Sequence, residues 1–339
     1  MQKEKTAKKT DLQSEFAKSS SPQERFDYYM AHPEAEIDPR FAAELKDKHV
    51  VLVAGWGARL IRLLERLLKV PKEQRYMAQP AINLKKMGAY VTIRHPRSVS
   101  IQRSTKELIE ELPSLYKKGG NRQIIVVGHS RGGMIATMTG MMAPHLLRPQ
   151  EGQDKAMIRK LITFQSPVNG HYYTDNILVK LLSMAGLGFM KSGGNFGLGA
   201  LTHENIHELF SADAFRKRLS HADQELVRNS ILYFVGGTDN IPLVDKLAGP
   251  TDGVVPLDNQ RRTEYGSVAG VYTDVSHLNA MIAMGSARKS ASRALALSFT
   301  EAVAKSLAMG PEWDKIVSDA MEKKLQGVLK TGRVAPTSR

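Results

Sequence analysis

The 339-residue chain contains no cysteine. This absence excludes disulfide bonds, thiolate metal sites and a cysteine nucleophile, and it fits a reducing compartment. Long apolar runs are missing too, since no stretch reaches the roughly 18 apolar residues of a membrane-spanning helix. Residues 1–16 are basic but have no apolar centre, so they do not have the pattern of a secretory signal peptide. These absences predict a cytoplasmic protein, for which any export would follow a non-classical route.

The chain is basic, with 48 lysines and arginines against 34 aspartates and glutamates and a formal net charge of +14. Such a balance favours anionic partners. The charges are scattered, with no arginine-rich helix and no regular interleaving of aromatic residues. We therefore expect a solvated surface first, contact with an anionic membrane surface second, and no specific binding of nucleic acid. The 42% of hydrophobic residues are ample for a core.

Residues 123–142 contain the most informative pattern in the chain. Residues 124–127 are a short apolar, β-branched run that predicts a buried strand, and a segment with helical spacing follows the sequence GHSRG. This is the G-x-S-x-G pattern in its setting of strand, sharp turn and helix. Gly128 and Gly132 leave room around the turn, which exposes the hydroxyl of Ser130. We predict that Ser130 is a nucleophile.

Strands and helices alternate around this motif. The pattern indicates a parallel sheet with helices on both faces. Expected strands cover residues 49–53, 88–93, 124–127, 158–164 and 231–235. We divide the chain into a basic, partly disordered extension with short helices (1–48), a catalytic domain (49–309) and a C-terminal helix with a basic tail (310–339). Alternation stops in residues 170–229, which are rich in glycine and are interpreted as an inserted helical cap or lid.

A serine elbow of this kind is followed along the chain by an acid and then a histidine. His277 is the only histidine beyond the expected strands, and we expect it to exchange a proton with Ser130. Asp252 follows a strand and turn about 25 residues earlier and is the preferred acid. Asp239 lies directly at the end of a strand and is the alternative.

An oxyanion hole requires two backbone N–H groups aimed at the developing negative charge. We expect one from Arg131, the residue after the nucleophile. The second is expected from Trp56, in the loop after the first strand, where glycines on both sides allow close approach. The side chain of His129 is expected to point away from the serine hydroxyl and to pack inside.

The segments VLVAGWG, GAYVTIRHP, GHSRGG, ITFQSPVNG, TDGVVP and VSHLNAM resemble bacterial triacylglycerol lipases of the α/β-hydrolase superfamily. The resemblance covers roughly residues 50–284. It implies the α/β-hydrolase fold, a lid, hydrolysis of long-chain carboxylic esters, a Ser130–Asp252–His277 triad, and Trp56 and Arg131 as oxyanion donors. Ala54 stands where the family commonly has a histidine, and the ligands of the calcium that some members hold have no match.

The function expected is therefore that of a serine carboxylic ester hydrolase, a lipase or esterase with phospholipases included, that acts through an acyl-enzyme. The expected partner is a lipid or other apolar ester, with no cofactor and no metal. An acyltransferase on the same scaffold is one alternative. A catalytically idle hydrolase fold that binds a membrane or protein partner through its basic surface is the other.

Overall fold

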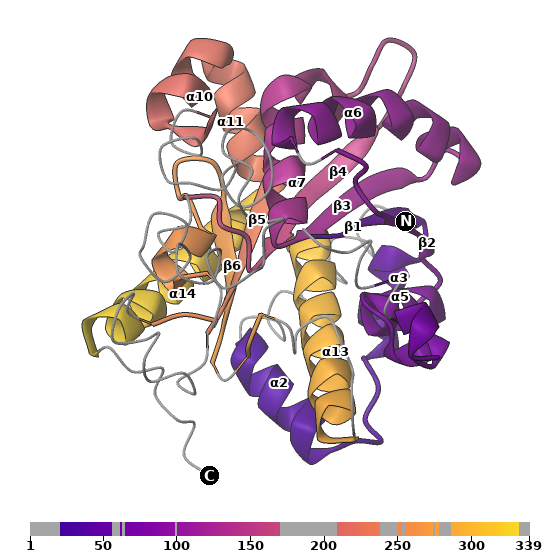
Figure 1. Ribbon diagram of the computed structural model, residues 1–339. Coiled ribbons are helices and arrows are strands. Elements are labelled where there is room, and N and C mark those ends of the chain that lie inside the picture. The colour runs from indigo at the N-terminus through magenta and orange to yellow at the C-terminus, as the bar shows by residue number, and fades with distance from the viewer. Residues whose placement is uncertain are drawn as a thin grey trace, which may run out of the picture.

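The computed structural model describes residues 21–55, 62, 65–98, 100–169, 209–237, 250–252, 255–273, 275–277 and 286–331. Within them, six strands form one sheet in the order β2-β1-β3-β4-β5-β6, and every neighbouring pair is parallel (Figure 1). The strands are β1 (Lys48–Val53), β2 (Tyr90–Arg94), β3 (Gln123–His129), β4 (Ile158–Phe164), β5 (Ile231–Gly236) and β6 (Ser267–Tyr272). The prediction of a parallel sheet is confirmed.

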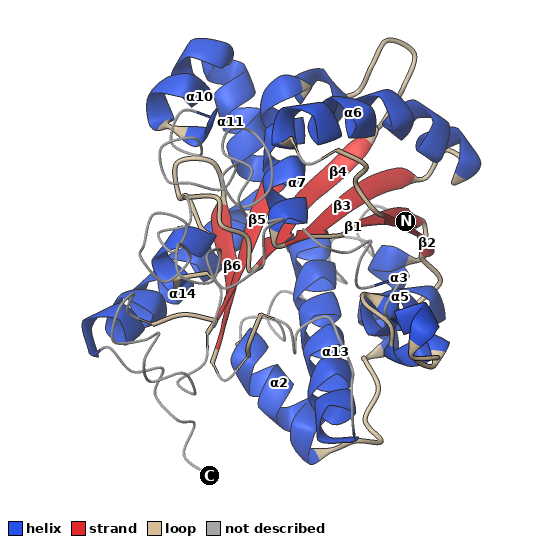
Figure 2. Ribbon diagram, viewed as in Figure 1, coloured by secondary structure: helices blue, strands red, loops and turns tan. Residues whose placement is uncertain are grey.

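The sheet is covered by helices on both faces (Figure 2). The helices are α2 (Pro22–Ala31), α3 (Pro39–Leu45), α5 (Ala78–Lys86), α6 (Ile101–Lys118), α7 (Arg131–Met142), α10 (Ala212–Arg218), α11 (His221–Ser230), α13 (Ser286–Met309) and α14 (Pro311–Thr331). Short 3-10 turns cover Lys72–Gln74, Pro144–Leu147 and Leu257–Gln260. Helices α6, α7 and α14 pack on one face, and α2, α3, α5 and α13 pack on the other.

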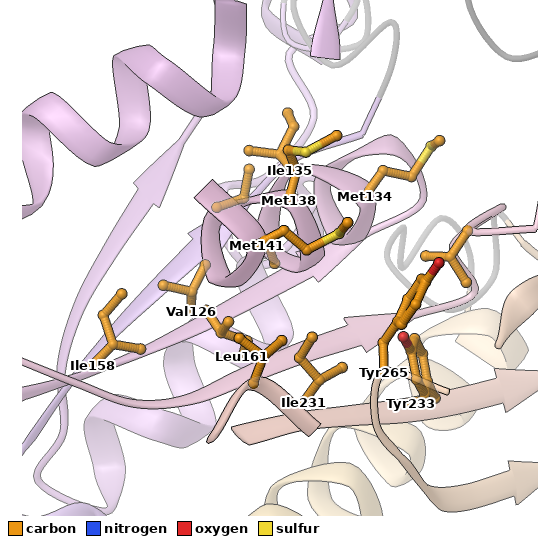
Figure 3. Packing of buried hydrophobic residues seen from close by; sticks show 14 of the residues in the cluster. Val126, Met134, Ile135, Met138, Met141, Ile158, Leu161, Ile231, Tyr233 and Tyr265 are labelled. Carbon is orange, nitrogen blue, oxygen red and sulfur yellow. The ribbon is translucent and has the colours of Figure 1, made fainter. Parts of the chain in front are cut away.

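Alternate residues of the central strands supply the two halves of the core. In β3, Ile124 and Val126 join the cluster under α6 and α7, whereas Ile125 and Val127 join the cluster under α13. Figure 3 shows part of the first cluster, in which Val126, Leu161 and Ile231 come from the strands and Met138 and Met141 come from α7. Because a strand buried on both faces needs apolar side chains in both directions, β3 is a continuous apolar run.

The edge strand β6 is absent from the sequence-based prediction. Its sequence SVAGVY has only two β-branched apolar residues and includes a glycine. The glycine is required by packing, since a Cβ on Gly270 would lie 2.8 Å from Cδ1 of Phe234. Helix α14 covers this edge, and the Val268 N–H donates to Ser318 Oγ over 2.9 Å. A helix of the same chain therefore satisfies an edge group that would otherwise be unpaired.

Short helices are expected before the first strand, and α2 and α3 lie there. Helix α2 begins with a capping box, in which Ser21 and Glu24 cap each other's backbone N–H groups. The buried hydroxyl of Tyr29 donates to Glu301 of α13 over 2.8 Å. This contact ties α2 to the helix that lies under the middle of the sheet.

Most of the expected cap, residues 170–208, lies outside the described residues. The described remainder includes α10 and α11, and Phe210 and Phe215 pack in the same cluster as α7. The assignment of residues 170–229 as a lid stays a prediction. No helix in the described ranges is both long and apolar enough to cross a lipid bilayer.

Candidate active site

Ser130 occupies a strained turn between the end of β3 and the start of α7. Its φ and ψ angles are 55° and −130°, a conformation that non-glycine residues rarely adopt. Strain of this kind costs roughly 1–3 kcal/mol and persists only where the surroundings impose it. Here the Ser130 N–H donates to the Phe164 carbonyl of β4 over 2.9 Å. The side chain is half-buried at the carboxyl edge of the sheet.

Close packing explains the glycines of the motif. A Cβ on Gly128 would collide with the Gly132 carbonyl, and one on Gly132 would collide with the Val53 carbonyl of β1. A Cβ on Gly55, in the loop after β1, would lie 2.9 Å from the Cβ of Ser130. The loop after β1 therefore lies directly against the serine.

This arrangement falls where the strand order reverses. The chain leaves β1 toward β2 on one side and later returns to β3 on the other side. Ligands of open α/β sheets bind at such a switch point, outside the carboxyl ends of the strands. Gly55 and Ser130 lie on the two loops that border it.

Asp252 and His277 form a buried pair. Nδ1 of His277 lies 2.7 Å from Oδ2 of Asp252, and the His277 N–H donates to the Asp252 carbonyl over 2.8 Å. The Asp252 carboxylate also accepts the Val255 N–H at Oδ1 over 2.6 Å and the Gln260 side-chain amide at Oδ2 over 3.3 Å. These hydrogen bonds together fix the orientation of the Asp252 carboxylate. The alternative acid, Asp239, lies outside the described residues.

Two glutamines attach this pair to the sheet. The Gln260 side chain accepts the Gly236 N–H over 2.8 Å and donates to the Gly236 carbonyl over 2.9 Å, at the end of β5. The Gln165 side chain, after β4, donates to the Val275 carbonyl in the histidine loop over 3.0 Å. The histidine loop is thus held by the ends of β4 and β5.

His129 links the two halves of the site. Its ring lies 4.7 Å from the ring of His277, measured between centroids. Nδ1 of His129 is 2.7 Å from the hydroxyl of Tyr76, and that hydroxyl accepts the Gly55 N–H over 3.0 Å. Burial, followed by the neighbouring His277, holds the pKa of His129 well below its usual value. The imidazole is therefore neutral.

Tyr76 keeps its proton, because burial raises the pKa of its hydroxyl. Since its oxygen accepts from Gly55, its own O–H is available to Nδ1 of His129. The Tyr76 N–H in turn donates to the buried Glu65 carboxylate over 2.6 Å. A chain of hydrogen bonds therefore connects the loop beside Ser130 with the ring that packs on His277.

Arg131 is the first residue of α7, where a backbone N–H has no intrahelical acceptor. Its guanidinium is buried and donates to the carbonyls of Ser98 and Ser100 and to the hydroxyl of Ser104, over 2.8 to 3.0 Å. Burial lowers the pKa of Arg131 to about 10. The side chain fastens the elbow to the start of α6. Trp56 lies outside the described residues.

A family model called the PGAP1-like alpha/beta domain matches residues 86–296, more than half of the chain. The chain belongs to this family. No curated protein matches its sequence. The PGAP1-like domain has the α/β-hydrolase fold, as the sequence predicted, and solved structures of the same fold include a carboxyl esterase and a phospholipase.

Two solved structures illustrate the shared fold. A metagenomic carboxyl esterase is 14% identical, with a TM-score of 0.52, over 78% of this chain and 76% of the esterase. Phospholipase PlaB from Legionella pneumophila is 15% identical, also with a TM-score of 0.52, over 84% of this chain and 64% of PlaB. At these identities the likeness concerns the fold.

Sequence reasoning did not find several residues of the candidate site in this PGAP1-like domain. Tyr76, Gln165 and Gln260 have no motif, since each acts through a buried hydrogen bond to a distant loop. His129 does pack inside as expected, but it packs on His277 and bonds to Tyr76. The only sequence signal for this role of His129 was its position beside Gly128 of the motif.

Proposed function

We propose that the protein is a serine carboxylic ester hydrolase that acts on apolar acyl or lipid esters through an acyl-enzyme. The observation that carries this proposal is the strained, half-buried Ser130 at the same sheet edge as the Asp252–His277 pair. A serine on a sharp strand-to-helix turn and a carboxylate-bound imidazole are the components of a nucleophilic triad.

In the proposed acylation step, Oγ of Ser130 attacks the ester carbonyl carbon while Nε2 of His277 takes the hydroxyl proton. The imidazolium passes this proton to the departing alcohol. Asp252 holds the other ring nitrogen, which selects the tautomer with a free Nε2 and stabilises the positive charge.

Deacylation repeats these steps with water. His277 takes a proton from water, the resulting hydroxide attacks the acyl carbon, and the Ser130 oxygen recovers the proton as the acid leaves. The carbonyl oxygen becomes negative in both steps. The Arg131 N–H, at the start of α7, and the Trp56 N–H are the proposed donors. Removal of one such donor typically raises the activation free energy by about 3–4 kcal/mol.

The proposed substrate class is supported by the family and by the names of two proteins of the same fold, a carboxyl esterase and a phospholipase. The formal charge of +14 favours esters presented at an anionic lipid surface. Attack by an alcohol in place of water would make the enzyme an acyltransferase.

The test is labelling with a fluorophosphonate followed by a panel of esters of increasing acyl length. We expect stoichiometric labelling of the native protein, no labelling of Ser130→Ala, and the highest kcat/KM on apolar chains. Analysis of the products with and without an added alcohol separates hydrolysis from acyl transfer. An unlabelled native protein that turns over no ester would favour the idle, partner-binding alternative.

A further inference from the structure

A cavity lies beside the loop that contacts Ser130. It has a volume of about 340 Å³ and opens between the turn Lys72–Gln74, the residues before it and the end of β2. Tyr76 forms part of its wall, and the hydroxyl of the same tyrosine holds the Gly55 N–H. One aromatic side chain therefore separates this cavity from the loop beside Ser130.

The lining of this cavity is strongly cationic. It includes four basic side chains against one acidic side chain, Glu65, which is buried and accepts the Tyr76 N–H. The basic residues are Arg62, Arg66, Lys72 and Arg75. Within the described ranges, none of the four forms an ion pair.

A cavity elsewhere in the molecule does not have such a lining of unpaired cations. It has a volume of about 380 Å³ and lies between α2, α13 and α14. There the cations are matched by carboxylates: Arg25 and Lys305 bind Glu301 over 3.0 and 2.9 Å. In contrast to that cavity, the one beside Tyr76 is lined by several cations that form no ion pair in the described part of the chain.

We propose that this cavity binds the phosphate of a phosphate-bearing head group on the ester substrate, an inference that rests on the proposed ester hydrolase function. Several guanidinium groups and an ammonium suit the multiple oxygens and double charge of a phosphate better than a single carboxylate. A volume near the lower limit of ligand pockets fits a head group and not a pair of acyl chains. The acyl ester would then extend past Tyr76 to Ser130.

The first experiment compares two soluble esters, dihexanoyl phosphatidic acid and dihexanoylglycerol, both below their aggregation limits. We expect the native enzyme to prefer the phosphate-bearing ester in kcat/KM by about tenfold, since a few exposed charge pairs together supply an effect of this order. The preference should shrink as ionic strength rises. The variant Arg62→Gln/Arg66→Gln/Lys72→Gln should lower the ratio toward one, and Arg62→Lys/Arg66→Lys should largely restore it.

The matched control is Lys117→Gln/Lys118→Gln. These two exposed lysines lie at the end of α6, before β3, and hence at the opposite edge of the sheet from Ser130. The control should leave the ratio of the two rates unchanged. If the ratio is unchanged in Arg62→Gln/Arg66→Gln/Lys72→Gln as well, the proposal is overturned. A preference that appears only with anionic vesicles would also overturn it, in favour of general attraction to a surface.

A binding measurement keeps this inference separate from catalysis. Calorimetric titration of Ser130→Ala with glycerol 3-phosphate should show binding. This binding should be lost when Arg62→Gln/Arg66→Gln/Lys72→Gln is added, and inorganic phosphate should bind more weakly. If the native protein turns over neither ester yet binds glycerol 3-phosphate, the hydrolase proposal fails and the anion site stands. If esters are hydrolysed and glycerol 3-phosphate does not bind, the hydrolase proposal stands and the proposed phosphate site fails.

Discussion

The two sides of the candidate active site are built in different ways. On the serine side, Gly128, Ser130 and Gly132 come from one continuous stretch, and contacts that leave no space for extra atoms determine their geometry. On the histidine side, Asp252 and His277 are 25 residues apart and meet through hydrogen bonds. The serine side is therefore sensitive to added atoms, whereas the histidine side is sensitive to lost partners.

Removing either reacting group should have the largest effect. Ser130→Ala and His277→Ala should each lower kcat by several powers of ten, because the nucleophile or its base is gone. Both variants should keep the native circular dichroism spectrum, since Ser130→Ala removes one oxygen from a half-buried side chain and the Asp252 carboxylate keeps its Val255 and Gln260 donors when His277 is removed. Retention of more than about a hundredth of the activity in either variant would contradict the assigned roles.

Replacing the carboxylate of Asp252 by an amide is the smallest chemical change expected to disrupt the histidine side. Asp252→Asn should lower kcat by about 10⁴-fold, because an amide stabilises the wrong imidazole tautomer and not the imidazolium. Asp239→Asn is the matched variant and should have far less effect. Steady-state kinetics of both variants on one soluble ester makes the comparison, and the reverse order would move the acid to Asp239.

Tyr76→Phe tests the connection between the two sides. The change leaves the Gly55 N–H and Nδ1 of His129 without their buried partner, which typically costs 1–3 kcal/mol per group. We expect kcat on a neutral ester to fall by about tenfold with little change in KM, because the loop beside Ser130 loses its anchor. Tyr116→Phe, on α6, is the control. A change in KM alone would show that Tyr76 contributes only to substrate binding.

The smallest effect expected is on the pH dependence of stability. Because the pKa of folded His129 is depressed, the unfolded chain binds an extra proton below about pH 6.5 and the folded protein does not. Stability should be full above this pH and fall below it, by at most about 1.4 kcal/mol per pH unit for this group. Urea unfolding at pH 7.5 and 5.5 should show a smaller loss for His129→Gln than for the native protein, and equal losses would contradict the buried neutral imidazole.

Several elements could be predicted because their signals are local. The apolar runs of β1, β3, β4 and β5 are recognisable in the sequence since these strands are buried on both faces. The edge strand β6 has no such run, because its pairing with β5 and its cover by α14 depend on distant residues.

By itself, the sequence determined the parallel α/β architecture and the serine elbow, because both depend on short-range periodicity and on glycines two residues from Ser130. It also predicted the acid as Asp252, with Asp239 as the alternative. Only the tertiary structure decided that Asp252 meets His277, that Tyr76 joins Gly55 to His129, and that four separate cations line one cavity. The physical reason is that such contacts are formed by side chains from loops at the ends of different strands. Their distances depend on the assembled sheet and not on their separation along the chain.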